Sequence, residues 1–211
     1  MTISSITETR INEQTNRFLK NHYSNVLLYA TTDPKDINGS GTAIIIDRNL
    51  STHIHEVEEE PGRAITLTLK FKNKTTVTIT SIYNKARRDK RISREIINHL
   101  KKYEHIDHRI IMGDLNENRK SKGPITKYLE GADNLINIAT IKDLQEHPTW
   151  QRGNSLSTID YIWTTPSIMA NTTDFEICDP EEWLDTDHQA LVIEMNTTGI
   201  TDNSPKVKRK Y

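Results

Sequence analysis

Hydrophobic and polar positions along the chain follow two periods, which together predict a mixture of strands and helices. Short apolar runs bounded by turn-forming residues are typical of buried strands. The runs predicted as strands are NVLLYA (25–30), TAIIID (42–47), RIIMGDLN (109–116), STIDYIWTT (157–165) and HQALVIEM (188–195), and PTW (148–150) is predicted to open another. Apolar residues at helical spacing predict helices over 8–23, 88–104 and 124–132.

Two neighbouring stretches alternate β-branched residues with other residues in a period of two. AITLTLKF (64–71) and TTVTITSIY (75–83) are joined by a short Lys-Asn-Lys segment. Because successive side chains of a strand point to opposite faces, this pattern predicts a hairpin with one face exposed to solvent. Hairpins mixed with helices that connect strands favour an α/β fold, in which two sheets pack as a sandwich and the helices lie outside.

The organisation predicts one folded domain over residues 1–196. No repeat or linker divides this range, and a chain of 211 residues can bury a sizeable core. The apolar pattern then stops, and residues 197–211 are polar and basic at their end, so we expect a disordered tail. PKVKRK (205–210) resembles a nuclear localisation signal, although a solvated tail is the simpler interpretation.

The composition excludes several classes of protein. Hydrophobic residues make up 34% of the chain and charged residues 27%, yet the charges nearly cancel to a formal net charge of −1. Any nucleic-acid binding would therefore need a local basic patch. The single cysteine, Cys178, excludes an internal disulfide and fits a reducing compartment. Without a signal-like or membrane-length apolar run, we expect an intracellular protein, cytoplasmic or nuclear, that binds no membrane.

Polar side chains gather where the predicted strands end. Asp114 and Asn116 follow the run RIIMG, and Tyr83 closes TITSIY. Asp187 and His188 stand directly before QALVIEM. If these strands are neighbours, their ends meet at one rim, where Asp114 and Asn116 can face the same object. An isolated Gly-Asp with a following Asn also has a purely structural explanation, because these residues suit a turn.

Asp160 stands inside an otherwise apolar run and therefore needs a partner. It lies between Ile159 and the residues 161–163, where an unpaired carboxylate would be costly to bury. His188 is the natural partner, because a carboxylate behind an imidazole fixes its tautomer and favours its charged form. The sequence thus predicts an Asp160–His188 pair, which either serves catalysis or is only structural.

Five short motifs in a fixed order resemble a known superfamily. They are ETRI (8–11), SIYN (81–84), MGDLNE (112–117), STIDYIW (157–163) and TDHQALV (186–192). This order resembles the endonuclease/exonuclease/phosphatase superfamily, the DNase-I-like phosphodiesterases. The last two motifs, with PTW and GTAIIID (41–47), look most like endonuclease domains of non-LTR retrotransposons. The resemblance covers about residues 8 to 195 and implies the two-sheet DNase-I-like sandwich.

The resemblance implies a metal site. It makes Glu8, Asp114 and Asp187 the metal ligands, with Asp114 also holding or activating the attacking water. The implied ion is Mg²⁺, or Mn²⁺ in its place, because phosphodiester hydrolysis needs a hard cation on oxygen ligands beside a positioned water. The eight histidines form no zinc pattern, and we interpret the pair in HIH (53–55) as surface residues.

The resemblance also implies groups that contact the phosphate. Tyr83 would donate a hydrogen bond to a phosphate oxygen, and Asn116 would orient the water or the phosphate. His188 would bind the scissile phosphate and stabilise developing charge, with Asp160 orienting the imidazole. Donors aimed at a charged transition state are what this chemistry requires.

DNA is the expected partner, and no obligate protein partner is evident. The residues proposed to contact DNA are Lys85, Arg87, Arg88, Arg119, Trp150 and Arg152. A solvated helix start explains the basic run at 85–91 equally well.

The superfamily carries an earlier strand, with an Asn of the metal site, before the Glu motif. Here Met1 is only seven residues ahead of Glu8, so we expect this first strand to be missing and one sheet edge to be exposed. The expected function is a Mg²⁺-dependent endonuclease that nicks DNA. The alternatives are an impaired pseudo-nuclease that keeps the fold, and a phosphatase of the same superfamily acting on a small phosphate ester or a phospholipid headgroup.

Overall fold

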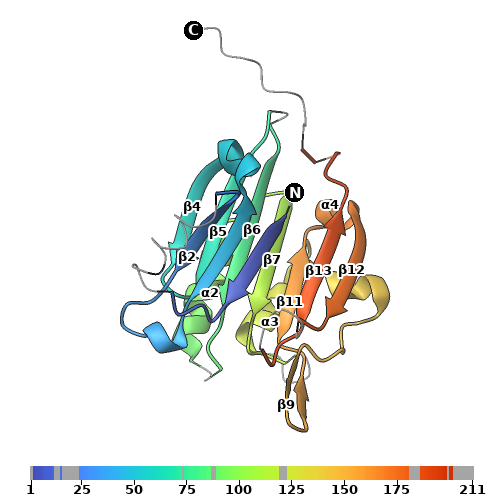
Figure 1. Ribbon diagram of the computed structural model, residues 1–211. Coiled ribbons are helices and arrows are strands. Elements are labelled where there is room, and N and C mark those ends of the chain that lie inside the picture. The colour runs from blue at the N-terminus through green and yellow to red at the C-terminus, as the bar shows by residue number, and fades with distance from the viewer. Residues whose placement is uncertain are drawn as a thin grey trace.

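A mixed sheet of six strands forms the central layer of the computed structural model (Figure 1), which describes residues 2–11, 15, 24–72, 74–86, 89–118, 123–180, 186–198 and 200–201. Its strands, in spatial order, are β4 (Ile54–Glu60), β5 (Ala64–Lys70), β6 (Thr76–Tyr83), β7 (His108–Asp114), β11 (Asp160–Thr164) and β8 (Ile136–Asn137). Only β6 and β7 pair in parallel; the other neighbours are antiparallel.

Two smaller sheets pack on one face of the central sheet. One has the order β1 (Ile3–Thr7), β3 (Thr42–Asp47), β2 (Val26–Thr31), and the other pairs β12 (Thr172–Cys178) with β13 (Ala190–Met195). Their inward residues, such as Ile44 and Phe175, share one apolar core with Leu67 and Ile79 of the central sheet. The expected sandwich of two layers is confirmed, with the second layer divided into two sheets.

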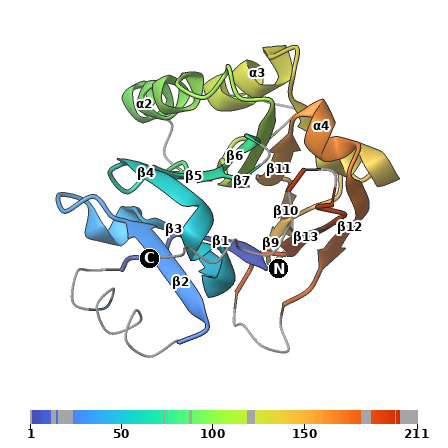
Figure 2. The same cartoon turned by 90° about the horizontal axis from the view of Figure 1, so that it is seen from above.

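Helices cover the opposite face of the central sheet, as Figure 2 shows from above. Helix α2 (Lys90–Lys101) buries Ile92, Ile96 and Leu100 against this face, and α3 (Pro124–Gly131) lies beside α2. Smaller elements are α4 (Pro166–Met169), the hairpin of β9 (Trp150–Arg152) and β10 (Ser155–Ser157), and 3-10 helices at Ile37–Gly39, Arg48–His53 and Ile138–Lys142. The predicted helices over 88–104 and 124–132 therefore exist, slightly shorter than expected.

The prediction that the β5–β6 hairpin has one solvent-exposed face is wrong. Nearly every residue of both strands is buried, because α2 covers the face on which the threonines lie. There the Thr66 hydroxyl is 2.8 Å from the Thr80 hydroxyl and 2.8 Å from His99 Nε2 of α2. Threonine suits this position because its hydroxyl is satisfied by a neighbour while its methyl group packs.

The remaining comparison with the predicted elements is mostly favourable. The five apolar runs correspond to β2, β3, β7, β11 and β13, and PTW to the start of β9, whereas β1, β4, β8, β10 and β12 were not predicted. Most of the segment 8–23 lies outside the described residues, as does most of the predicted tail, although Ile200 and Thr201 are described and are buried. Within the described part, β1 pairs only with β3, and β13 only with β12, so one edge of each strand has no partner strand. Across the described ranges, no helix is long and apolar enough to cross a membrane.

Candidate active site

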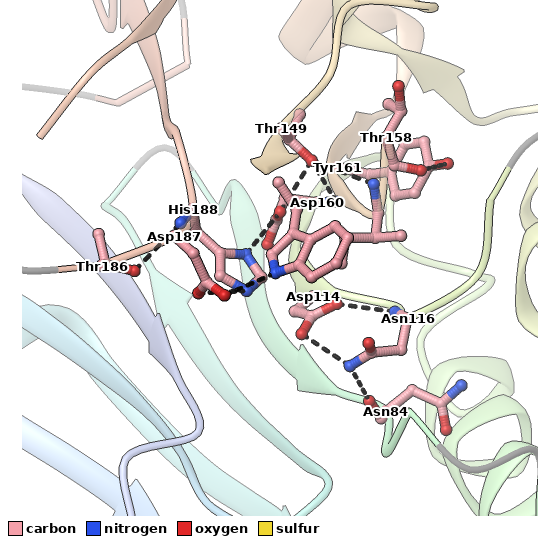
Figure 3. A network of polar contacts seen from close by, with 12 residues as sticks. Asn84, Asp114, Asn116, Thr149, Thr158, Asp160, Tyr161, Thr186, Asp187 and His188 are labelled. Carbon is pink, nitrogen blue, oxygen red and sulfur yellow. Dashed lines mark hydrogen bonds and ion pairs between the residues drawn. The ribbon is translucent and has the colours of Figure 1, made fainter. Parts of the chain in front are cut away.

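Polar groups from four strands meet at one rim of the sandwich, as the sequence predicted. In the register of the central sheet, Asp114 at the end of β7 stands beside Tyr83 at the end of β6 and beside Asp160 at the start of β11. His188 reaches the same rim from the segment before β13 and forms an isolated β-bridge with Trp150. Figure 3 shows the side chains of Asp114, Asp160 and His188 pointing toward one another.

Asp114 is 4% exposed, and both of its carboxylate oxygens accept hydrogen bonds from Asn116. The backbone N–H of Asn116 donates to Oδ1 and its side-chain amide donates to Oδ2, each at 2.7 Å. The same amide donates to the carbonyl of Asn84 at 2.7 Å, which ties the ends of β6 and β7 together (Figure 3). Asn116 has a left-handed backbone with φ 46°, a conformation that Asn tolerates better than most residues. Asn116 therefore fixes the orientation of the Asp114 carboxylate.

Gly113 allows Asp114 to reach the rim. Its φ is +138°, and a Cβ atom there would lie 2.0 Å from the carbonyl oxygen of Ile82 on β6. No side chain fits at that distance. The glycine of the GDLN motif is thus required by the close approach of two backbones, beyond its suitability for a turn.

The predicted pair of Asp160 and His188 is present. Asp160 Oδ2 accepts a hydrogen bond from His188 Nδ1 at 2.9 Å and another from the Thr149 hydroxyl at 2.8 Å. The Thr149 oxygen in turn accepts from the backbone N–H groups of Ile159 and Asp160, each at 3.0 Å. Sequence reasoning missed Thr149. The only available signal was its position in the PTW motif.

Asp114, Asp160 and His188 form the one group in the described part of the chain that could hold a metal ion. One ligand atom from each lies within 4.8 Å of the others. Two carboxylates are hard oxygen donors of the kind that Mg²⁺ takes, with water and phosphate filling its other positions. The donor set therefore fits a divalent cation, and the buried Asp114 carboxylate would gain most from its charge.

Glu8 and Asp187, which the resemblance made metal ligands, lie outside this group. Glu8 is close enough to raise the pKa of Asp114 and Tyr83, but its carboxylate binds Arg10 at 2.6 Å. Asp187 accepts a hydrogen bond at Oδ2 from the indole N–H of Trp150 at 2.9 Å. Their assignment as metal ligands stays a prediction.

Burial and charge shift three pKa values at the rim. Burial and the negative charge of Asp160 raise the pKa of Asp114 to about 8, although the hydrogen bond from Asn116 opposes this shift. Burial alone would lower the pKa of His188, but the hydrogen bond to Asp160 and the surrounding carboxylates raise it to about 9. Burial, with the charges of Glu8 and Asp114, raises the pKa of Tyr83 to about 12. At neutral pH the His188 imidazole is therefore cationic and the Tyr83 phenol is a donor.

Three of the six predicted DNA contacts can be placed. Lys85 Nζ donates to Asp36 Oδ2 at 2.7 Å, an oxygen that also accepts from Arg63 at 2.9 Å. Trp150 contacts Asp187, and Arg152 is exposed on β9. Arg87, Arg88 and Arg119 lie outside the described residues.

The second carboxylate of the GDLNE motif has a structural role. Glu117 is 7% exposed, and its two oxygens accept from the backbone N–H groups of Ile125 and Thr126 at 3.3 and 2.8 Å. Unsatisfied N–H groups at a helix start favour a carboxylate. Glu117 therefore caps the start of α3.

The family profile described as Endonuclease-reverse transcriptase matches residues 77–192, more than half of the chain. The chain therefore belongs to this family, within the endonuclease/exonuclease/phosphatase superfamily of DNase-I-like proteins. This superfamily consists of hydrolases that include DNA-acting nucleases and phosphatases. No curated protein matches the sequence.

Solved structures with the same fold include three DNA-processing proteins. An AP endonuclease, LMAP from Leishmania major, has a TM-score of 0.72 at 13% identity, covering 92% of this chain and 78% of that one. The endonuclease domain of TRAS1, a telomere-specific non-LTR retrotransposon, has a TM-score of 0.60 at 15% identity, covering 82% of this chain and 81% of that one. The 3′ phosphatase NExo from Neisseria, bound to a product DNA hairpin, has a TM-score of 0.64 at 13% identity, covering 92% of this chain and 88% of that one. At these identities the similarity establishes the fold.

Proposed function

We propose that the chain is a divalent-metal-dependent endonuclease of the retrotransposon type that nicks DNA. The observation that carries this proposal is the group of Asp114, Asp160 and His188 at the rim of the sandwich, in which His188 is hydrogen-bonded to Asp160. It combines carboxylates that fit a metal ion with a cationic imidazole beside them. Hydrolysis of a phosphodiester needs both, since negative charge grows on the phosphate in the transition state.

The contacts at the rim support a role for each residue. Asp114 and Asp160 would hold the Mg²⁺ or Mn²⁺ ion, and Glu8 and Asp187 remain proposed further ligands. When bound, the ion would polarise the phosphate and lower the pKa of a bound water. Asp114, ionised when the cation is bound and with its orientation fixed by Asn116, would accept a proton from the attacking water.

The phosphate would be held by donors on the other side of the rim. His188 uses Nδ1 to bind Asp160, so its Nε2–H would donate to a nonbridging oxygen of the scissile phosphate. The protonated Tyr83 phenol would donate to another. The side-chain NH₂ of Asn116 already donates to Asp114 and Asn84. Asn116 would therefore orient the water or phosphate through its side-chain oxygen. These donors would stabilise the five-coordinate phosphorus as the leaving oxygen departs.

DNA is the proposed substrate because basic groups lie beside the rim. Lys85 directly follows Asn84, whose carbonyl binds Asn116, and Arg152 is exposed on the β9–β10 hairpin. With Arg87, Arg88 and Arg119 they would contact the backbone phosphates of a duplex, which give sequence-independent affinity. A small phosphate ester would need no such spread of positive charge.

One observation favours the alternative of an impaired pseudo-nuclease. The Glu8 carboxylate pairs with Arg10 at 2.6 Å, so it would have to leave this partner to bind a metal ion in the site.

A substrate panel tests the proposal. Purified protein with Mg²⁺ is given supercoiled plasmid, a duplex oligonucleotide with a 3′-phosphate, and a phosphoinositide headgroup. We expect nicked plasmid without release of inorganic phosphate. Phosphate release from either of the other substrates, with the plasmid left intact, would show that the protein is a phosphatase and not an endonuclease. No reaction with any of them would support the pseudo-nuclease.

A further inference from the structure

The indole ring of Trp150 connects the β9–β10 hairpin to the residue beside His188. Its Nε1–H donates to Asp187 Oδ2 at 2.9 Å. The backbones of the two segments are joined as well, because Gln151 N–H donates to the Asp187 carbonyl at 2.9 Å and Gln189 N–H donates to the Thr149 carbonyl at 2.7 Å. Residues 149–151 and 187–189 thus form a short antiparallel contact centred on the bridge between Trp150 and His188.

The hydrogen bond from Trp150 fixes the orientation of the Asp187 carboxylate. The side chain of Asp187 is 43% exposed, and the last torsion of an Asp side chain rotates over a broad range when nothing holds it. With Oδ2 bound to Trp150, the other oxygen, Oδ1, lies 3.9 Å from His188 Nε2. Because Asp160 binds Nδ1 at 2.9 Å, the imidazole ring lies between two carboxylates whose orientations are both fixed by hydrogen bonds.

We propose that Trp150 is a positioning residue, which acts on catalysis by orienting Asp187 against the imidazole of His188. This inference rests on the proposed nuclease function. It differs from the interpretation of Trp150 as a base-stacking residue, because here the essential feature is the indole N–H donor. The donor can act only through Asp187, since that carboxylate is its hydrogen-bond partner.

The test replaces the donor but keeps an aromatic ring. Trp150→Phe is compared with Trp163→Phe, a matched control in which the same atom is lost. Trp163 is 5% exposed, and its Nε1 has no hydrogen-bond partner among the described residues, so this control removes an indole without removing a hydrogen bond. Both variants are assayed for kcat and KM on a duplex oligonucleotide with Mg²⁺, at a temperature where circular dichroism shows them folded.

We expect Trp150→Phe to lower kcat about tenfold with KM unchanged, as for loss of one hydrogen bond to a charged group, and Trp163→Phe to keep the wild-type kcat. In an Asp187→Ala background, Trp150→Phe should have no further effect, because its only route of action is gone. A raised KM with unchanged kcat would overturn the proposal in favour of stacking on DNA. Unchanged kcat and KM, or an equal further loss in the Asp187→Ala background, would overturn it as well.

A second readout does not depend on activity. In ¹⁵N-labelled protein, the indole N–H signal lost in Trp150→Phe identifies Trp150, and we expect its hydrogen exchange to become faster in Asp187→Ala. An unchanged exchange rate would show that the hydrogen bond is absent and would overturn the inference. If the wild-type protein cuts no DNA, the proposed function fails, and this measurement still decides whether Trp150 holds Asp187.

Discussion

Replacing Thr149 by valine removes one hydroxyl group and keeps the shape of the side chain. That hydroxyl donates to Asp160 Oδ2 at 2.8 Å and accepts from the N–H groups of Ile159 and Asp160 at 3.0 Å. The variant therefore tests whether the Asp160–His188 pair depends on a third residue behind it. Thr149→Ser, which keeps all three hydrogen bonds, is the matched control.

The expected loss of stability follows from the three bonds. A hydrogen bond to a charged group contributes about 1.5–3 kcal/mol, and a buried N–H without an acceptor costs about 1–3 kcal/mol. Thr149 is 1% exposed, so water does not readily replace its oxygen. Because losses within one network are not additive, we expect a total near the lower end of the sum, about 3 kcal/mol. For a chain of this size the melting temperature would fall by about 6–12 °C.

The assay is thermal unfolding by circular dichroism, together with kcat for plasmid nicking at a temperature where every variant is folded. We expect Thr149→Val to lose about tenfold in kcat, because Asp160 is then held less firmly behind His188. Thr149→Ser should stay close to wild type in both measurements. A melting temperature and kcat for Thr149→Val equal to those of Thr149→Ser would refute the reasoning.

Three further predictions concern charge at the rim. In EDTA, the protonated form of His188 stabilises the fold. This contribution is fully present below the pKa of His188 in the unfolded chain, about 6.5, and it is lost as the pH rises through the pKa in the fold, about 9. The free energy of unfolding measured in urea should therefore fall between pH 7 and 9.5, and it should fall less in His188→Asn than in wild type. The raised pKa of Asp114 likewise means that its ionised form is disfavoured in the fold, so stability falls as the pH rises from about 4 through about 8. Asp114→Asn should consequently unfold at higher urea than wild type at pH 9 in EDTA, and equal midpoints would contradict this. Finally, Lys85→Ala should make the dependence of log KM on log salt shallower by about 0.9, as for one lost phosphate contact. An unchanged slope would show that Lys85 pairs with Asp36 and does not contact DNA.

The main parts of the site could be predicted because short patterns in the sequence indicate them. GDLN marked the end of β7 as a polar terminus of an apolar strand, and Asp160 inside an apolar run required a partner, which His188 supplies. Both arguments need only strand periodicity and the cost of burying a charge.

Other features depend on contacts between distant segments, which no local pattern reveals. Thr149 belongs to the site only because the start of β9 lies against residues 187–189. Glu117 follows Asp114 by three residues in sequence, but α3 begins close enough to take its carboxylate as a cap. β4 and β12 escaped prediction because charged residues interrupt their apolar pattern: each contacts the core along one side and one neighbouring strand only.

The central claim is that the group around Asp114 cuts DNA with the help of a divalent cation. The most direct test is nicking of supercoiled plasmid by wild type, Asp114→Asn and Asp133→Asn, each with Mg²⁺ or with EDTA. Asp133 is exposed, so its replacement makes the same chemical change away from the rim. We predict nicking by wild type and Asp133→Asn that EDTA abolishes, and none by Asp114→Asn. Nicking that survives in Asp114→Asn, or a folded wild-type protein that leaves the plasmid intact with Mg²⁺, would contradict the account.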